Sequence, residues 1–131
     1  MKITDQSLHD INTKFARSGD MLPEEIFSFA DKYFSSIDQN NGNEVFFVTR
    51  KSARWMLNKL DHDLLTKREV ARVLYLKNQY TAEGNKSSWS DKPVVIDVEN
   101  GEVVDGLKRL YAVALCNNPK AVSLPIEFLG E

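Results

Sequence analysis

The sequence predicts a single α/β domain of the α+β kind, with a small mixed sheet, flanking helices and an extra helical segment at its N-terminus. Apolar residues alternate with more polar ones over residues 94–98 and 122–128, which is the period of a strand. Elsewhere apolar residues recur at the spacing of amphipathic helices. The length of 131 residues, of which 42% are hydrophobic and 27% charged, suits one folded unit. We therefore expect one domain over residues 1–131, with a helical extension over 1–43 and a core over 44–131.

The composition is that of a soluble globular protein. The formal net charge is −2 at pH 7 and the sequence pI is about 5.7, so the bulk charge gives no sign of nucleic-acid binding. The first twenty residues are polar and lack the apolar stretch of a signal peptide. No run approaches the ~20 apolar residues that a membrane-spanning helix needs. The single cysteine, Cys116, excludes an internal disulfide and is expected to be a small buried side chain. We expect a soluble, cytoplasmic protein without a membrane partner.

Two helices are predicted in the N-terminal extension. The first begins near Thr4 or Ser7 and has its apolar residues at Leu8, Ile11 and Phe15. The second opens at Pro23 and presents an apolar face of Ile26, Ala30, Tyr33, Phe34 and Ile37. Phe27 and Phe29 leave a further aromatic flank, which is either core or a surface that binds a partner. Residues 38–43, which read DQNNGN, are expected to form a turn.

The middle of the chain predicts a strand followed by two capped helices. Residues 44–48 are apolar enough for a central or well covered strand, and Thr49 can cap the helix that follows. Thr66 and Glu69 form the capping box of the next helix. The buried sides expected are Ala53, Met56, Leu57 and Leu60 in one helix, and Val70, Val73, Leu74 and Lys77 in the other. His62 stands between two aspartates, but three adjacent residues cannot converge on a metal ion as ligands spaced along a helix do.

Charge is unevenly distributed along the chain. Residues 1–50 carry eight acidic and five basic residues, whereas residues 51–86 carry eight basic and four acidic ones. The basic segment would suit a partner protein or a nucleoprotein complex, and a solvated helix face explains it equally well. The candidate partner-binding residues are Phe27, Phe29, Arg54, Arg68, Arg72 and Trp89.

The C-terminal third predicts a hairpin, an Asp-Gly elbow, a helix and a last strand. Asn100 and Gly101 form a dipeptide typical of tight hairpin turns, and helical spacing begins at Leu107. Residues 122–129 read as the last strand. Pro125 within it favours a place at the edge of the sheet, because proline cannot donate to the ladder.

The elbow before this last helix indicates an anion pocket. Lys108 and Arg109 fall in the first helical turn, where unpaired N–H groups and the helix dipole already present positive charge. Gly106 permits close approach of the backbone, and together these features suit a phosphate group. Alternatively, Asp105 and Glu102 neutralise the two cations as ordinary surface pairs.

The order of these elements, with several short motifs, resembles the ParB-like, sulfiredoxin-related superfamily, and more narrowly the single-domain ParB-like proteins of phages and mobile elements. The likeness covers residues 44–129. It includes the threonine-capped helix after the first strand, the polar break before the second helix, and the glycine-containing loop that ends in Trp89. His62 and Asp63 stand where the family often has an Asn-Arg pair.

The strongest likeness lies at the elbow, where the family pattern reads D-G-Q-H-R-L-x-A and this sequence reads DGLKRLYA. Asp105, Gly106 and Arg109 match the family pattern, whereas Leu107 and Lys108 replace its Gln-His pair. The resemblance implies a ParB/sulfiredoxin-like fold. It also implies that these five residues bind the phosphates of a nucleotide.

The resemblance leaves two functions open. One is a phage or mobile-element protein that binds a host protein or nucleoprotein complex, as an inhibitor of host defence, with a vestigial nucleotide site. The other is a nucleotide-dependent enzyme that hydrolyses ATP or CTP or transfers a phosphoryl group, with Mg²⁺ contacted by Glu102 and Asp105. No catalytic residue is assigned, because Lys108 replaces the family's histidine and is charged at neutral pH. Direct sequence-specific DNA binding is disfavoured, because the chain has no room for a separate helix-turn-helix domain.

Overall fold

The computed structural model describes residues 3–15, 24–25, 28, 35–40, 43–83, 93–116 and 122–129. The described helices are α1 (Asp5–Thr13), α3 (Arg50–Lys59), α4 (Lys67–Glu83) and α5 (Leu107–Leu115). The described strands are β1 (Ser35–Asn40), β2 (Asn43–Val48), β3 (Val94–Asp97), β4 (Glu102–Asp105) and β5 (Val122–Leu129). These elements confirm a mixed α+β architecture.

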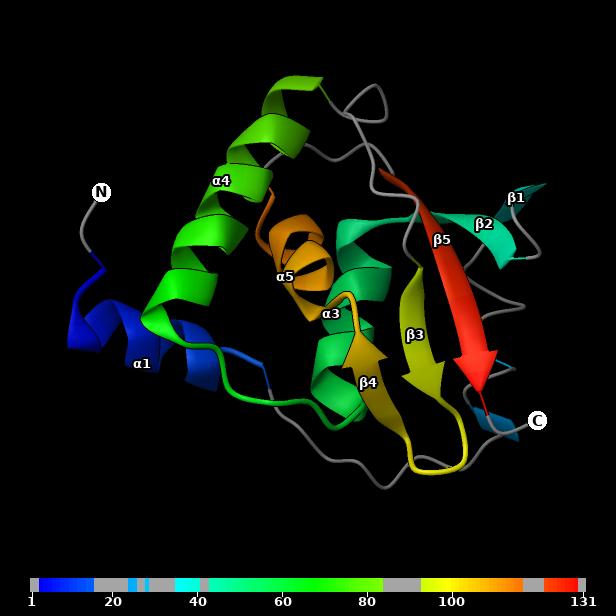
Figure 1. Cartoon of the computed structure of the whole chain (residues 1–131), viewed down its shortest axis with the longest axis horizontal. Coiled ribbons are helices and arrows are strands. Elements are labelled where there is room, and N and C mark those ends of the chain that lie inside the picture. Colours follow the sequence, from blue (N-terminus) through cyan, green and yellow to red (C-terminus); the bar gives the residue numbers. More distant parts are fainter. Residues whose placement is uncertain are drawn as a thin grey trace.

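The five strands form one mixed sheet in the order β1-β2-β5-β3-β4 (Figure 1). Every neighbouring pair is antiparallel except β3 and β5, which run parallel. The predicted hairpin is confirmed as β3 and β4, joined by a turn over residues 98–101 in which Gly101 has a φ of +64°. The sheet therefore joins two antiparallel ribbons, β1–β2 and β3–β4, through the last strand of the chain.

Strand β5 lies at the centre of the sheet, so the prediction of an edge strand from Pro125 was wrong. Pro125 pairs with Val45 of β2, and pairing with β3 begins one residue later, at Ile126 opposite Val94. At Pro125 the described part of β5 therefore still has a single neighbouring strand, where a missing N–H is tolerated. Ile126 is the residue that pairs on both sides, and it is buried.

The N-terminal extension is not helical throughout, because residues 35–40 form strand β1. The sequence predicted a helix through Ile37 and a turn from Asp38, and both predictions were wrong. β1 pairs with β2 from Asn40 opposite Asn43 outward, with Ile37 as an extra, bulged residue. Backbone pairing with a neighbouring strand overrides the weak helical pattern of this polar segment. Most of the second predicted helix, including Phe27 and Phe29, lies outside the described residues.

The described helices gather beside the sheet, with α5 between α4 and α3 (Figure 1). Five of the nine residues of α5 are buried, from Leu110 to Ala114, so this short helix forms the centre of the core. Thr49 caps α3 through a reciprocal bond with Ser52, as the sequence predicted for Thr49. The capping box of Thr66 and Glu69 at the start of α4 is also confirmed.

The segment between α3 and α4 is hydrogen-bonded to the β3–β4 turn and to helix α1. The Asp61 N–H donates to the Gly101 carbonyl over 2.7 Å, which holds the segment against the β3–β4 turn. The Asn12 side chain of α1 donates to the Leu65 carbonyl and accepts from its N–H, at 2.9 and 2.8 Å. His62 is buried, with its ring nitrogens 3.1–3.2 Å from two backbone carbonyls, so it belongs to the core.

No helix in the described part of the chain is both long and apolar enough to cross a membrane.

Candidate functional site

A bulge redirects the end of strand β4 before the elbow. Ile96 of β3 pairs with Val103, and Val95 pairs with Asp105, so Val104 is an extra residue in β4. A bulge bends its strand and changes the direction of the side chains beside it. Val104 and Asp105 are accordingly both exposed, whereas Val103 is buried.

Gly106 begins α5 in a conformation and a space that only glycine fits. Its φ is +82°, in the left-handed region that disfavours residues with a Cβ. A Cβ at this position would lie 2.8 Å from both the Cα and the Cγ2 of Val94. The Gly106 N–H donates to Oδ1 of Asp105 over 2.8 Å. This close approach fixes where α5 begins relative to strand β3.

The first turn of α5 carries two basic side chains and no acidic one. Lys108 and Arg109 follow directly after Leu107, and the glycine cap offers no side-chain acceptor to the first N–H groups. Cations at this end oppose the helix dipole, by about 0.3–1 kcal/mol each when exposed. An anion placed here would be shared by the backbone N–H groups and the two cations, which reverses that effect.

Arg109 is held partly inside the protein. Its Nη2 donates to the Pro93 carbonyl over 3.1 Å, which anchors the guanidinium beside the start of β3. Burial lowers the pKa of Arg109, whereas the negative charge of Asp105, and that of Tyr80 when its phenol is ionised, act in the opposite direction. Because an arginine pKa starts above about 12, the side chain keeps its charge at neutral pH.

Tyr80 of α4 supplies a neutral hydroxyl next to this cation. Its side chain is 2% exposed, and burial raises the pKa of the phenol to about 12, although the charges of Arg109 and Arg72 lower it. The phenol therefore keeps its proton at neutral pH and can donate a hydrogen bond.

The elbow and helix α4 enclose a pocket of about 590 Å³. Residues 103–109 line the pocket on the side of the elbow. The residues that line it from α4 and from the segment before α4 are Asp63, Glu69, Arg72, Leu76, Gln79 and Tyr80. The volume falls within the range of about 300–1,000 Å³ of small-molecule sites. Three cations thus converge on one pocket: Arg72 from α4, and Lys108 and Arg109 from α5.

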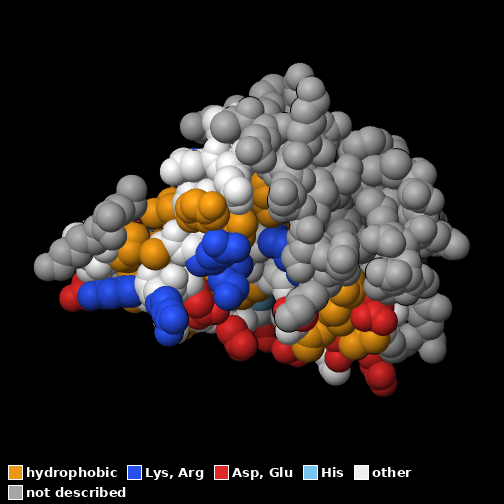
Figure 2. Space-filling view, turned by 45° about the horizontal axis from the view of Figure 1, so that its top comes forward, with side chains coloured by type: hydrophobic (Ala, Val, Ile, Leu, Met, Phe, Trp, Pro, Cys, Tyr) orange, Lys and Arg blue, Asp and Glu red, His pale blue; other side chains and the backbone are white. Residues whose placement is uncertain are grey.

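Three carboxylates line the same pocket, and two of them have structural partners. Glu69 accepts from the Thr66 N–H in the capping box, and Asp105 accepts from the Gly106 N–H. Asp63 is exposed. On the face shown in Figure 2, basic side chains gather near the centre with acidic side chains directly beneath them. The pocket is therefore of mixed charge, and it suits a ligand with both anionic and hydrogen-bond-donating groups.

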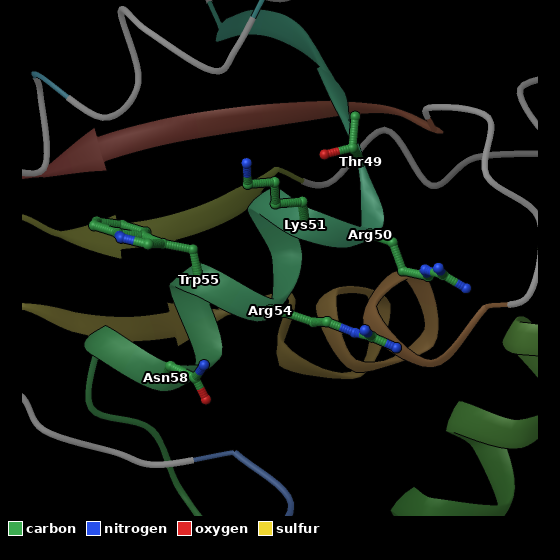
Figure 3. A pocket seen from close by; sticks show the side chains of 6 residues that line it. All are labelled: Thr49, Arg50, Lys51, Arg54, Trp55 and Asn58. Carbon is green, nitrogen blue, oxygen red and sulfur yellow. The ribbon is translucent and has the colours of Figure 1, made fainter.

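The opposite end of α5 shows the usual pairing of a helix C-terminus with cations. Arg54 Nε donates to the Ala114 carbonyl over 2.9 Å, and Arg50 Nη1 donates to the Cys116 carbonyl over 3.3 Å. Figure 3 shows both arginines directed from α3 toward α5, whereas Lys51 and Trp55 project to the other side of a second pocket of about 460 Å³. These two arginines satisfy terminal carbonyls and complement the dipole.

The structure brings some of the predicted site residues together and separates others. The five predicted phosphate-binding residues all line the elbow pocket, as does Arg72, which the sequence offered only as a partner-binding residue. Glu102 lies on β4 and is not one of the described residues that line the pocket beside Asp105. Arg68 is exposed in the first turn of α4, and Arg54 bonds to α5. Phe27, Phe29 and Trp89 lie outside the described residues.

Several residues of the pocket carried no functional signal in the sequence. Gln79 and Tyr80 belong to a helix whose pattern predicts only a buried side, and Asp63 stands in the polar break before that helix. The available signal was the helical spacing of Arg72, Leu76 and Gln79, which places them along one side of α4. That spacing does not say which other element this side faces.

The fold and the pocket together define a mixed α+β protein with a pocket of mixed charge at a glycine-capped helix start. No protein-family model, no curated protein and no solved structure matches this chain. The case for a function therefore rests on the residues of the pocket.

Proposed function

We propose that this chain is a binding protein on a ParB-like scaffold, and that its elbow pocket holds a phosphate group of the ligand. The observation that carries the proposal is the convergence of Arg72 with Lys108 and Arg109 beside the glycine-capped start of α5. A phosphate there would accept hydrogen bonds from backbone N–H groups at a helix N-terminus and charge-assisted bonds from Lys108 and Arg109.

The contrast between the two ends of α5 supports this assignment. At the C-terminal end, Arg50 and Arg54 satisfy backbone carbonyls directly. At the N-terminal end, Lys108 and Arg109 stand where the helix dipole disfavours cations. A bound anion turns this unfavourable arrangement into a favourable one. The positions of the two cations are therefore electrostatically stabilising only when an anionic ligand is bound.

Binding is favoured over catalysis by the residue at position 108. In the ParB-like pattern a histidine stands there, and a lysine ammonium cannot act as a general base at neutral pH without a large loss of basicity. We propose that the protein serves a phage or mobile element by engaging a host protein or nucleoprotein complex as an inhibitor, with the pocket as a retained nucleotide-phosphate site. The excess of basic residues over 51–86 suits an acidic partner of this kind.

A nucleotide-dependent enzyme is the second candidate, and the carboxylates of the pocket favour it. Asp63 and Asp105 are both exposed and line the pocket that contains the three cations. Magnesium is commonly held by one or two carboxylates together with the phosphates of ATP or CTP, so these two residues fit a metal-nucleotide complex. Within the described residues, no cluster of three or more His, Cys, Asp or Glu side chains is arranged for a metal alone. This candidate predicts slow release of inorganic phosphate from ATP or CTP that stops when Asp105 is changed to Asn.

The proposal is tested by calorimetric titration and thermal melting with tripolyphosphate, ATP and CTP, with and without Mg²⁺. We expect Arg72→Ala to weaken the binding of all three compounds at least fivefold, because the pocket loses one of its three positive charges. Arg68→Ala is the matched control, since it removes the same charge from the same helix outside the pocket. The proposal is rejected if no compound binds at millimolar concentration, or if the two variants weaken binding equally.

A further inference from the structure

The elbow pocket is larger than a phosphate group requires. Its volume of about 590 Å³ lies within the range of ~300–1,000 Å³ of pockets that bind drug-sized ligands. The cations Lys108 and Arg109 lie at the elbow, whereas the wall on the side of α4 contains Leu76 and Gln79. One part of the pocket thus suits an anion, and the remainder suits a flat, partly apolar group with hydrogen-bonding edges.

Arg72 lines the pocket from α4 and carries a flat cationic group. Its Cζ lies 5.1 Å from the centre of the Tyr75 ring, within the distance of a cation–π contact. Tyr75 is 54% exposed. Among the described residues, Arg72 lines the pocket and Tyr75 does not. The tyrosine ring therefore contacts one side of the guanidinium and does not cover the other side. Guanidinium planes and aromatic rings are the surfaces on which nucleobases stack.

The carboxylates of the pocket point to the same class of ligand. A polyphosphate alone would meet repulsion from Asp63 and Asp105 as well as attraction from the cations. A ribose supplies hydroxyl donors, and acidic side chains are common partners of ribose hydroxyls in nucleotide sites. A pocket with three cations and three carboxylates is therefore better matched by a nucleoside phosphate than by a simple anion.

We infer that a nucleoside phosphate in this pocket stacks its base on the guanidinium of Arg72, with Tyr75 as the residue that positions this guanidinium. The inference rests on the proposed phosphate site and adds a base-binding subsite on α4. Phosphate is held at residues 106–109, the sugar lies beside the carboxylates, and the base lies along Arg72, Leu76 and Gln79.

The test compares tripolyphosphate with ATP and CTP at equal ionic strength, in the wild type and four variants. Stacking is worth roughly 1–3 kcal/mol per base, so we expect the nucleotides to bind about 5- to 150-fold more tightly than tripolyphosphate. Arg72→Lys keeps the positive charge but loses the flat surface, so it should abolish most of this preference while retaining tripolyphosphate binding. Tyr75→Ala should reduce the preference and Tyr75→Phe should keep it, because phenylalanine preserves the ring. Arg68→Lys, outside the pocket, should change nothing.

The outcomes separate this inference from the proposed function. Equal affinity for tripolyphosphate and for nucleotides overturns the base subsite and leaves the phosphate site in place. The same is true if Tyr75→Ala weakens both kinds of ligand to the same extent. Absence of binding by every compound overturns the phosphate site and the base subsite together.

Discussion

Gly106 and Val94 touch so closely that no side chain fits between the elbow and strand β3. A Cβ on Gly106 would lie 2.8 Å from the Cα of Val94, which is backbone and cannot rotate away. Val94 is itself held in the sheet opposite Ile126 of the central strand. The start of α5 is thereby fixed relative to the sheet, and the cations of its first turn are fixed with it.

Gly106→Ala is expected to destabilise the protein by about 1–3 kcal/mol, because a left-handed φ in a residue with a Cβ is strained. The steric overlap with Val94 adds to this cost. Gly106→Asn should recover only part of the loss, since asparagine tolerates the left-handed region but still carries a Cβ. Urea unfolding of the three proteins measures both effects. If the asparagine variant were as stable as the wild type, the close contact with Val94 would be contradicted.

Much of the fold could be predicted because its signals are local. Thr49, Thr66 and Gly106 mark helix starts through their own chemistry, and the spacing of apolar residues defines α3, α5 and the β3–β4 hairpin. The errors arose where pairing partners decide the outcome. Residues 35–40 are polar and become a strand by pairing with β2, and Pro125 sits in a central strand because β3 begins pairing only after it.

The candidate site was predictable in its elbow and not in its opposite wall. Gly106, Lys108 and Arg109 are contiguous, so their common position follows from one helix start. Arg68 and Arg72 are equivalent in the sequence of α4, and only the packing of α4 against α5 places Arg72 rather than Arg68 in the pocket. Arg54 shows the reverse case, because a residue expected to bind a partner bonds instead to the end of α5.

Arg54→Ala is expected to reduce the free energy of unfolding by about 1 kcal/mol, because the Ala114 carbonyl loses a charged donor at a helix C-terminus. The loss should shrink at high salt, where the interaction with the dipole is screened. Arg68→Ala, which removes an exposed charge from α4, should change stability by less than about 0.5 kcal/mol. Chemical denaturation of both variants at low and high salt provides the measurement. Equal stability of the two variants would show that Arg54 contributes nothing through α5.

Tyr80 is expected to make stability fall at alkaline pH. Burial raises the pKa of its phenol to about 12 in the folded protein, against about 10 for an exposed tyrosine. The folded state thus holds this proton more tightly than the unfolded state. The resulting contribution to stability is complete below about pH 10 and is lost as the pH rises toward 12.

Tyr80→Phe isolates this contribution from the other groups that titrate in the same range. Between pH 10 and 12 the unfolding free energy of the wild type should fall more steeply than that of the variant, by up to about 1.4 kcal/mol per pH unit for one proton. Phenolate absorbance gives a second readout, because the variant should lack a component that titrates near pH 12 in the folded wild type. A missing component that titrates below pH 10 would instead place the hydroxyl in contact with water, and would contradict the buried position of Tyr80 beside Arg109.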